Sequence, residues 1–334
     1  MSKHVLITGV AGFLGSHLAD ALLLRGHRVT GVDNLSMGST ANIAHHFEHP
    51  GFRFHQLDIL DLDALKQIAG DVQVVVHMAA FKIPRYGHRL DTLQLNTRGT
   101  EHALEVARLA GAKFVLASTS DVYGKNANIP FDEEDDSVIG PSAVGRWSYA
   151  TSKMFDEHLC WGYQEKYGLA CTVIRIFGSY GPRHHLSWWG GPQSVFIDLL
   201  LKDEPITIHG DGLQTRSFTY VEDTVSGFVA VVERDEANGE LFNIGDDREI
   251  SILGLARLLH GLMGKTGEPE LQIIPYDQIA GRRYEDVRRR VPDNTKARRL
   301  LGFDPRTSLE IGLERTIAWQ RQVRQGQGSL LTTF

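Results

Sequence analysis

Residues 5–15 read Val-Leu-Ile-Thr-Gly-Val-Ala-Gly-Phe-Leu-Gly, a short apolar run that leads into Gly9, Gly12 and Gly15. In residues 16–25, leucine and alanine recur at helical spacing. The stretch is therefore predicted as a strand, a glycine turn and a helix. Glycines in such a turn let the backbone bend tightly and approach a pyrophosphate at the helix N-terminus. Taken alone, the glycines would equally suit a tight turn without a ligand.

The alternation of strand and helix continues along the chain. Further strands are predicted at 29–32, 52–57, 72–77, 113–117, 170–176, 205–209 and 241–244, and helices at 61–68, 92–109, 148–167, 193–201, 219–233 and 252–263. Strands that alternate with helices predict an α/β fold, a Rossmann-type doubly wound parallel sheet with right-handed crossovers. Residues 124–146, rich in Pro, Gly, Asp and Glu, are expected to form a surface loop.

The composition limits the classes of function. The 334 residues are 42% hydrophobic and 23% charged, with a formal net charge of -6. This is ordinary for a globular chain and argues against a nucleic-acid or membrane-surface partner. Cys160 and Cys171 lack metal-ligand spacing, so no metal site is expected. No run approaches the ~20 apolar residues of a membrane span, and a cytoplasmic protein is expected.

Asp33 ends the second predicted strand, where a carboxylate would accept hydrogen bonds from both ribose hydroxyls of a dinucleotide and repel a 2'-phosphate. Together with the glycine turn, it predicts NAD rather than NADP as the cofactor. Asp58 ends the third strand with Ile59 beside it, and this pair could bind and pack against adenine. A strand-end turn aspartate is an equally good interpretation of Asp58.

Tyr149 and Lys153 are four residues apart in a predicted helix, so their side chains share one face. A nearby cation favours the phenolate, which makes Tyr149 a candidate base near neutral pH for hydride transfer from an alcohol. Thr119, just beyond the fifth strand, can hydrogen-bond the same substrate oxygen. Alone, Tyr149 would suit a core position and Lys153 a solvated face. Thr119 and Ser118 alone would suit hydroxyls that cap a strand end.

The chain resembles the extended short-chain dehydrogenase/reductase family, in particular its nucleotide-sugar epimerases, dehydratases and decarboxylases, over nearly its whole length. The motifs that carry the resemblance lie at 8–17, 33–35, 58–59, 77–80, 96–100, 118–124, 149 with 153, 180–183 and 215–221. By this resemblance the NAD-binding residues are Gly9, Gly12, Phe13, Leu14, Gly15, Asp33, Asn34, Asp58, Ile59, Ala79, Ala80, Lys82, Asn96, Ser118, Tyr149 and Lys153. Asn96 would also hold the active-site helix, and Lys153 would bond the nicotinamide ribose.

The two residues after Thr119 bear on the fate of a sugar that has been oxidised to its 4-keto form. The family's 4,6-dehydratases have Asp then Glu there and its UDP-glucuronate decarboxylases have Ser then Glu, whereas this chain has Ser120 and Asp121. Serine is a poor general acid, which disfavours dehydration, and the shorter Asp121 leaves decarboxylation open. A 4-epimerase needs no further acid or base. The resemblance thus favours an isomerase, an NAD-dependent nucleotide-sugar 4-epimerase, with decarboxylase-like or dehydratase-like conversion as the alternative.

The substrate, a nucleotide-diphosphate sugar, would be bound by Ser120, Asp121, Gly178, Arg216 and Arg283. Arginine binds phosphates through bidentate hydrogen bonds. Arg216 resembles the family's diphosphate-binding arginine, and Arg283 is the candidate second clamp. Many relatives have Asn in place of Gly178. The arginines at 288–290 are interpreted as a solvated face.

Residues 184–191 form a longer and more aromatic loop than is usual in the family, and Trp147 stands where relatives often have proline. A lid packed for stability and direct stacking on the sugar are equally good interpretations of this loop. An unusual sugar, such as a uronic acid, a heptose or an antibiotic precursor, is therefore expected.

Two lobes are expected. Residues 1–178, with returning segments near 215–245, would form the NAD-binding Rossmann domain, and residues 179–330 most of a smaller C-terminal α/β substrate lobe. The helices near 92–109 and 148–167 resemble those that pair in family dimers, so a homodimer is expected. A regulator that binds NAD without turnover is the remaining alternative to an enzyme.

Overall fold

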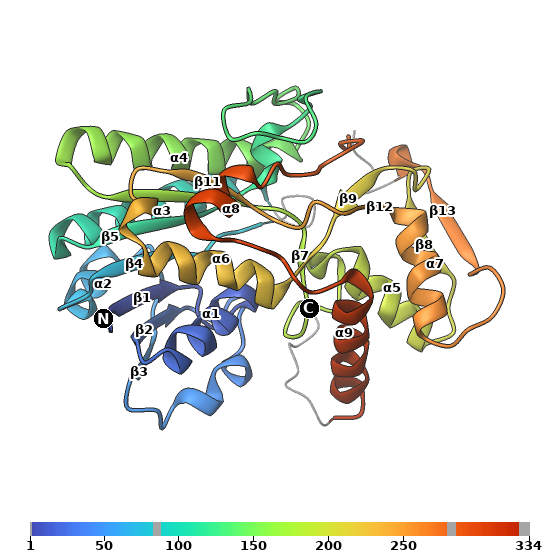
Figure 1. The fold of residues 1–334 in the computed structure, drawn as a ribbon, viewed down its shortest axis with the longest axis horizontal. Coiled ribbons are helices and arrows are strands. Elements are labelled where there is room, and N and C mark those ends of the chain that lie inside the picture. The colour runs from blue at the N-terminus through green and yellow to red at the C-terminus, as the bar shows by residue number, and fades with distance from the viewer. Residues whose placement is uncertain (1, 83–87, 279–284, 327–334) are drawn as a thin grey trace.

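The computed structural model describes residues 2–82, 88–278 and 285–326. Its centre is a seven-stranded parallel sheet in the order β11-β6-β5-β4-β1-β2-β3 (Figure 1). These strands are β1 (His4–Thr8), β2 (Arg28–Asp33), β3 (Phe52–Gln56), β4 (Val74–His77), β5 (Lys113–Thr119), β6 (Cys171–Ile176) and β11 (Leu241–Ile244). The strand order reverses between β1 and β4, where an open α/β sheet forms a crevice at its carboxyl ends. The predicted Rossmann-type sheet is confirmed.

Both faces of the middle of the sheet are buried, which is why β1 and β4 are nearly continuous apolar runs. In β1, Val5 and Ile7 pack on one face, while Leu6 between them packs on the other. β4 repeats the pattern, with Val75 facing away from its two neighbours. This alternation follows from the two-residue repeat of a strand.

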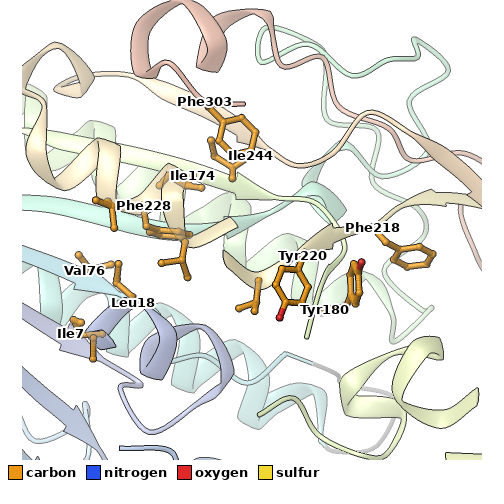
Figure 2. Packing of buried hydrophobic residues seen from close by; sticks show 14 of the residues in the cluster. Ile7, Leu18, Val76, Ile174, Tyr180, Phe218, Tyr220, Phe228, Ile244 and Phe303 are labelled. Carbon is orange, nitrogen blue, oxygen red and sulfur yellow. The ribbon is translucent and has the colours of Figure 1, made fainter. Parts of the chain in front are cut away.

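Helices cover the two faces. One face carries α2 (Leu62–Ala69), α3 (Arg89–Ala110) and α4 (Trp147–Tyr167). The other carries α1 (Phe13–Leu24), α6 (Val221–Glu233) and α8 (Thr295–Leu301). Figure 2 shows Leu18 of α1 near Ile7 and Phe228 of α6 near Ile174, so the two helices cover neighbouring parts of the sheet. The chain thus returns to the central sheet after residue 215 with α6 and β11.

The smaller lobe stands at one end of the sheet (Figure 1). It contains α5 (Pro192–Leu201), β8 (Ile206–His209), β9 (Thr215–Ser217), β12 (Glu249–Ser251), α7 (Ile252–Leu262), β13 (Leu271–Ile274) and α9 (Leu309–Arg324). β7 (Ser179–Tyr180) and β10 (Thr219–Tyr220) pair where the lobes join. The rings of Tyr180 and Tyr220 meet edge to face there, 5.8 Å between centroids (Figure 2). Both belong to the apolar core that runs from the sheet into the smaller lobe.

The differences from the sequence predictions are local. Residues 219–220, predicted as the start of a helix, are a strand that pairs with β7, and the helix begins at Val221. The short strands β7, β9, β12 and β13 and the helices α8 and α9 were not predicted. Strands of two to four residues carry too few alternations to be recognised, and their pairing partners set them instead.

α3 and α4 pack against each other on one face of the sheet. Leu109 at the end of α3 and Phe155 on α4 are 55% and 51% exposed. The homodimer expected through these helices stays a prediction. Among the described residues, no helix combines the length and the apolar character that crossing a bilayer requires.

Candidate active site

A cavity of about 510 Å³ lies between the carboxyl ends of the central strands and the smaller lobe. Of the residues predicted to bind cofactor or substrate, its walls contain Gly9, Gly12, Phe13, Leu14, Gly15, Asp33, Asn34, Ile59, Ala79, Ala80, Lys82, Ser118, Thr119, Ser120, Asp121, Tyr149, Gly178 and Arg216. Asp58, Asn96 and Lys153 lie off the walls of the described cavity. Arg283 lies outside the described residues. The fold therefore gathers most of the predicted set at one place.

The glycine turn between β1 and α1 is too tight for side chains. Gly9 has a φ of +75°, in the left-handed region, and a Cβ on Gly15 would lie 2.1 Å from the carbonyl oxygen of Gly9. α1 begins at Phe13, directly after Gly12, which offers no capping side chain. The first amide groups of α1 are therefore available to a phosphate at the cavity wall.

Asp33 is fixed at the end of β2 by two backbone amides. Its Oδ2 accepts from Ala11 N at 3.0 Å and its Oδ1 from Leu35 N at 2.8 Å. Burial raises the pKa of this carboxyl, and the two amide donors oppose the rise. A carboxylate held at the cavity wall in this way suits the ribose hydroxyls of NAD and repels a 2'-phosphate.

Asn34, Asp58 and Ile59 complete this end of the cavity. Asn34 Nδ2 donates to Asp58 Oδ2 at 3.0 Å. Asp58 itself is exposed, whereas Ile59 is buried and lines the cavity. Asp58 and Ile59 were predicted to contact the adenine. Ile59 lies on the cavity wall, whereas Asp58 lies off it and is bonded to Asn34.

Asn96 connects the segment after β4 to α4, the helix that contains Tyr149, through hydrogen bonds. Its Oδ1 accepts from Phe81 N at 2.8 Å, and its Nδ2 donates to Ser152 Oγ at 2.9 Å. All of its side chain is buried. Asn96 is therefore placed to position other groups rather than to touch a ligand in the described cavity.

Ser118 joins a second buried network. Its Oγ donates to Glu157 of α4, and Arg175 of β6 donates to the same carboxylate through Nε at 3.2 Å and Nη2 at 2.8 Å. The Arg175 and Glu157 side chains are 8% and 5% exposed. This bidentate pair fixes α4 against the sheet beside the cavity.

Thr119 and Tyr149 meet at the centre of the cavity. Thr119 is the last residue of β5 and Tyr149 lies in the first turn of α4. A hydrogen bond from the Thr119 side chain acts to lower the pKa of Tyr149, and both residues line the cavity. The expected contact of both hydroxyls with one substrate oxygen stays a prediction.

Lys153 departs from its expected role. Its Nζ donates to Asp156 Oδ2 at 2.9 Å, and the two side chains are 1% and 0% exposed. Burial raises the pKa of Tyr149, and the negative charges of Asp121 and Asp156 raise it further. The hydrogen bond from Thr119 offsets only part of the rise. The pKa of Tyr149 is thus raised, chiefly by burial, rather than lowered by Lys153, whose charge is paired with Asp156. The role of Tyr149 as the base stays a prediction.

Beyond Thr119, three arginines and two aspartates on the cavity wall form an alternating chain of ion pairs. Arg290 Nη1 contacts Asp121 Oδ1. Arg146 lies 3.3 Å from Asp121 Oδ1 and 3.1 Å from Asp286 Oδ1. Arg216 donates to Asp286 Oδ1 at 2.8 Å and also to the Val287 carbonyl at 2.8 Å. The expected diphosphate arginine is thus already held by a carboxylate.

The pKa values show that both aspartates of this chain of ion pairs are ionised at neutral pH. Burial raises the pKa of Asp121, but Arg290 and Arg146 outweigh it and hold the pKa below its usual range. Burial also raises the pKa of Asp286, but the three arginines outweigh it and lower this pKa to about 2. With three arginines against two carboxylates, the cluster keeps one net positive charge.

Sequence reasoning missed Arg146, Asp286 and Arg290. Arg290 was interpreted as part of a solvated face, and this is wrong: its side chain is 20% exposed, against 70% for Arg288 and 55% for Arg289. Nothing in the sequence of residues 288–290 indicates which of the three arginines is buried. Arg290 is the least exposed because it pairs with Asp121, which lies 169 positions away in the sequence.

Gly178 occupies a position that is too tight for a side chain. Its φ is +45°, and a Cβ there would lie 2.2 Å from the carbonyl oxygen of Ser217. An asparagine at this position would require the backbone to shift. Ser217 Oγ is buried beside it on the cavity wall, without a hydrogen-bond partner among the described residues.

The aromatic loop 184–191 connects the two lobes. The His184 ring lies 4.1 Å from that of Phe13, and the Trp189 ring meets Phe81 at 5.1 Å. Lys82 Nζ donates to the Trp189 carbonyl at 3.3 Å. The loop both packs against the cofactor lobe and lines the cavity, so its contacts fit the lid and the stacking interpretations alike.

One cluster in the described part of the chain has donor atoms suited to a metal. Asp20, His45 and His46 each bring a ligand atom within 4.8 Å of the others. Asp20 Oδ2 accepts from Arg183 Nη1 at 2.8 Å, and both imidazoles contact Oδ1. The cluster lies off the cavity wall, and its carboxylate is already used by these partners.

The fold and the cavity together define a class: a doubly wound sheet with a glycine turn after β1 and a threonine, tyrosine and lysine at its carboxyl end is a short-chain dehydrogenase/reductase. Comparison with known proteins specifies the family. The family described as GDP-mannose 4,6 dehydratase matches residues 6–316. The chain belongs to this extended family of nucleotide-sugar enzymes, which includes epimerases and decarboxylases.

Two curated relatives are decarboxylases. The chain is 37% identical to the UDP-N-acetyl-alpha-D-glucosaminuronate decarboxylase of Bacillus cytotoxicus, over 97% of this chain and 99% of the relative. It is 37% identical to the UDP-glucuronic acid decarboxylase 1 of Xenopus tropicalis, over 98% and 74%.

A solved structure with the same fold is an epimerase. The UDP-glucuronic acid 4-epimerase of Bacillus cereus, in complex with UDP-glucuronic acid and NAD, has a TM-score of 0.85 and 31% identity, covering 96% of this chain and 99% of that one.

Proposed function

We propose that the protein uses NAD to oxidise C4 of a nucleotide-linked uronic acid and then releases the carboxyl group as CO2. The observation that carries this proposal is the ionised Asp121, held between Arg146 and Arg290 on the cavity wall directly after Thr119. The curated decarboxylases that match nearly the whole chain support it.

The residues present fit NAD. The turn at Gly9 and Gly15 has no room for side chains, so its bare backbone on the cavity wall could approach a pyrophosphate, and Asp33 stands at the wall where a ribose would lie. The bound cofactor would accept hydride from C4 and later return it. Ile59 and Ala79 would pack against its flat rings.

Tyr149 and Thr119 would act on the C4 oxygen. The Tyr149 oxygen takes the hydroxyl proton and Thr119 holds the oxygen in place by a hydrogen bond. Because the pKa of Tyr149 is raised, its ionisation is part of the barrier. Activity is therefore expected to rise with pH.

Asp121 would favour loss of CO2 by electrostatics. The cluster as a whole keeps one net positive charge and would attract a substrate carboxylate, and Asp121, ionised on the cavity wall, would then repel it as the neighbour of like charge. That repulsion is relieved when the C5–C6 bond breaks and neutral CO2 leaves. The bonding pair passes into the enolate of the 4-keto group. C5 then takes a proton from water, and the C4 oxygen regains its proton from Tyr149.

The second candidate is 4-epimerisation, the leading expectation from the sequence. It requires only Tyr149, Thr119 and room for the keto-sugar to turn. The likeness to a UDP-glucuronic acid 4-epimerase favours it. Both candidates share the first oxidation step.

The test is to incubate the NAD-loaded protein separately with UDP-glucuronate, UDP-N-acetylglucosaminuronate and UDP-glucose, with mass spectrometry and proton NMR as readouts. Conversion of a uronate to a product that has lost CO2 is expected. A product of unchanged mass with inverted C4 would establish the second candidate. Conversion of UDP-glucose alone would reject both uronate reactions.

Asp121→Asn separates the role of this carboxylate from that of the fold. The variant should bind NAD normally and release CO2 far more slowly, by roughly a hundredfold. The matched control is Asp136→Asn, an exposed aspartate in the stretch 124–146 that follows. If Asp121→Asn decarboxylates at the rate of the control, the electrostatic role of Asp121 is rejected.

A further inference from the structure

Trp147, the first residue of α4, is a large side chain that the proposed reaction does not use. It is 2% exposed and belongs to a small apolar cluster with Val144, Ala150 and Val287. Trp147 is not among the residues on the wall of the described cavity, although Arg146 and Tyr149 on either side of it are. Any effect of the indole on a substrate must therefore pass through a neighbouring residue.

The indole holds the segment that follows β13 at two points. Its Nε1 donates to Glu285 Oε2 at 3.4 Å, and the same oxygen lies 2.5 Å from Lys125 Nζ. Val287, two residues further, is 7% exposed and lies in the same apolar cluster as Trp147. The two residues that flank Asp286 are thus both anchored at the indole.

Asp286 itself lines the cavity, where it meets Arg216. Asp286 Oδ1 accepts from Arg216 Nη2 at 2.8 Å, and the carbonyl oxygen of Val287 accepts from Nη1 at 2.8 Å. The carbonyl of Thr215, the preceding residue, also accepts from Nη1, at 2.6 Å. Both oxygens that hold this guanidinium from outside its own strand therefore come from the stretch anchored at Trp147.

The indole also lies beside a second arginine of the cavity wall. The Arg146 guanidinium is 5.3 Å from the centre of the Trp147 ring, and the Lys125 ammonium is 5.6 Å from it. Cations placed over an aromatic face are attracted to it. Arg146 in turn lies 3.1 Å from Asp286 Oδ1. The ring thus bears on Asp286 through its cationic neighbour as well as through the backbone.

Resting on the proposed function, we propose that Trp147 is a positioning residue for the substrate diphosphate. It holds Glu285 and Val287, and through the stretch between them it sets the place of the Arg216 guanidinium on the cavity wall. Hydrogen bonds from an arginine to phosphate oxygens depend on direction. A guanidinium displaced by about 1 Å therefore loses part of its affinity for the diphosphate.

The test measures the affinity of the NAD-loaded protein for UDP by isothermal titration calorimetry. Trp147→Phe keeps an aromatic ring beside Arg146 and removes the N–H that holds Glu285. UDP should bind this variant about fivefold more weakly, whereas the affinity for NADH should stay within about twofold. Unchanged affinity for UDP, or an equal loss for UDP and NADH, would overturn the positioning role, since the second result is that of a general loss of structure.

Trp161→Phe is the matched control. Trp161 lies on the same helix, packs against the apolar core on the far side of the sheet from α1, and is not on the wall of the described cavity. The same substitution there should leave the affinities for UDP and NADH within about twofold of the unaltered protein. A loss of UDP affinity equal to that of Trp147→Phe would show that the effect is not specific to the contact with Glu285.

A double-mutant cycle identifies the group through which Trp147 acts. Arg216→Met removes the guanidinium, so adding Trp147→Phe to this variant should weaken UDP by less than about twofold, because no guanidinium is left to displace. If Trp147→Phe costs the same fivefold with and without Arg216, the two residues act independently and the proposal is wrong.

Glu285 tests the link from its other end, since it is not on the wall of the described cavity either. Glu285→Ala should weaken UDP about as much as Trp147→Phe does. Glu285→Gln keeps an acceptor for the indole N–H and should recover most of the lost affinity. If Gln is as weak as Ala, the ion pair with Lys125 holds Glu285, and the role given to Trp147 is rejected.

Turnover of a uronate by the unaltered protein adds a second readout. Trp147→Phe should raise KM about fivefold and change kcat by less than about twofold, because the loss concerns binding and not the chemical step. A lower kcat at unchanged KM would contradict the proposal.

The binding measurements need no turnover, so they separate this inference from the proposed function. Loss of UDP affinity through Arg216 without conversion of any uronate would leave the inference standing and reject the function. Conversion of a uronate by a protein whose affinity for UDP is indifferent to Trp147 would do the reverse. An unaltered protein that does not bind UDP would reject the inference.

Discussion

Lys153 Nζ lies 2.9 Å from Asp156 Oδ2, within α4 and fully buried. The positive charge of Lys153, one turn after Tyr149, is therefore paired with a carboxylate and does not act on the phenol alone. Asp156 is also one of the two carboxylates that raise the pKa of Tyr149, the other being Asp121. The candidate base is thus held neutral in a way that the spacing of tyrosine and lysine in the sequence does not reveal.

Asp156→Asn should make Tyr149 a stronger base at low pH. Removing the negative charge while keeping an oxygen for Lys153 lowers the pKa of Tyr149, because both burial and this charge raise it. The rising limb of the plot of turnover rate against pH should move to lower pH. The exposed Asp63→Asn is the control. A limb that stays in place or moves to higher pH would contradict the assigned cause.

Asp33→Ser should change the cofactor preference. The carboxylate at the end of β2 would repel a 2'-phosphate, so the unaltered protein should bind NADH at least about tenfold more tightly than NADPH. The variant should narrow this ratio, as measured by fluorescence titration. Asp58→Asn is the control variant, because the Asp58 carboxyl is exposed and is bonded to Asn34. Equal affinities for the two cofactors in the unaltered protein would refute the role given to Asp33.

Glu157→Gln should destabilise the protein strongly. It leaves Arg175 buried without its ionic partner and disturbs the bond from Ser118. The free energy of unfolding should fall by about 3–5 kcal/mol, measured by urea denaturation. The exposed Glu165→Gln on the same helix should change it by less than about 0.5 kcal/mol. Comparable values for the two variants would show that the buried pair does not fix α4.

Asp286 should contribute to stability in a defined range of pH. The three arginines outweigh the effect of burial and lower its folded-state pKa from 3.8 to about 2. A lowered carboxyl pKa gives stability that is full above the unfolded value and is lost as pH falls toward the folded one. The difference in unfolding free energy between the unaltered protein and Asp286→Asn should therefore shrink by roughly 2 kcal/mol between about pH 5 and 2. A difference that does not change with pH in that range would exclude the ion pairs as its source.

The sequence was sufficient for the parts of the molecule that depend on short-range pattern. The apolar runs of β1, β4 and β5 and the glycine turn at Gly9 follow from burial on both faces and from steric limits. Thr119 and Tyr149 come together because the carboxyl end of β5 faces the start of α4, which the resemblance to a known family already implied. These features need no knowledge of distant partners.

The charged cluster could not be predicted in the same way. Arg146 lies just before α4, whereas Asp286 and Arg290 lie more than a hundred residues later in the segment that follows β13. Their burial depends on how the segment after β13 closes over the cavity, which is a tertiary property. The pairing of Lys153 with Asp156 is different, since a residue three positions along a helix is a visible partner. That contact could have been recognised from the sequence.

The most direct test of the proposed reaction tracks two labels of one substrate through a single conversion. UDP-glucuronate carrying deuterium at C4 and carbon-13 at C6 is incubated with the NAD-loaded protein, and the product and the released gas are analysed by NMR and mass spectrometry. We expect labelled CO2 and a product that keeps deuterium at C4, because the hydride that leaves C4 returns to it. Carbon-13 retained in the product, or protium at C4 after loss of CO2, would contradict the proposed reaction.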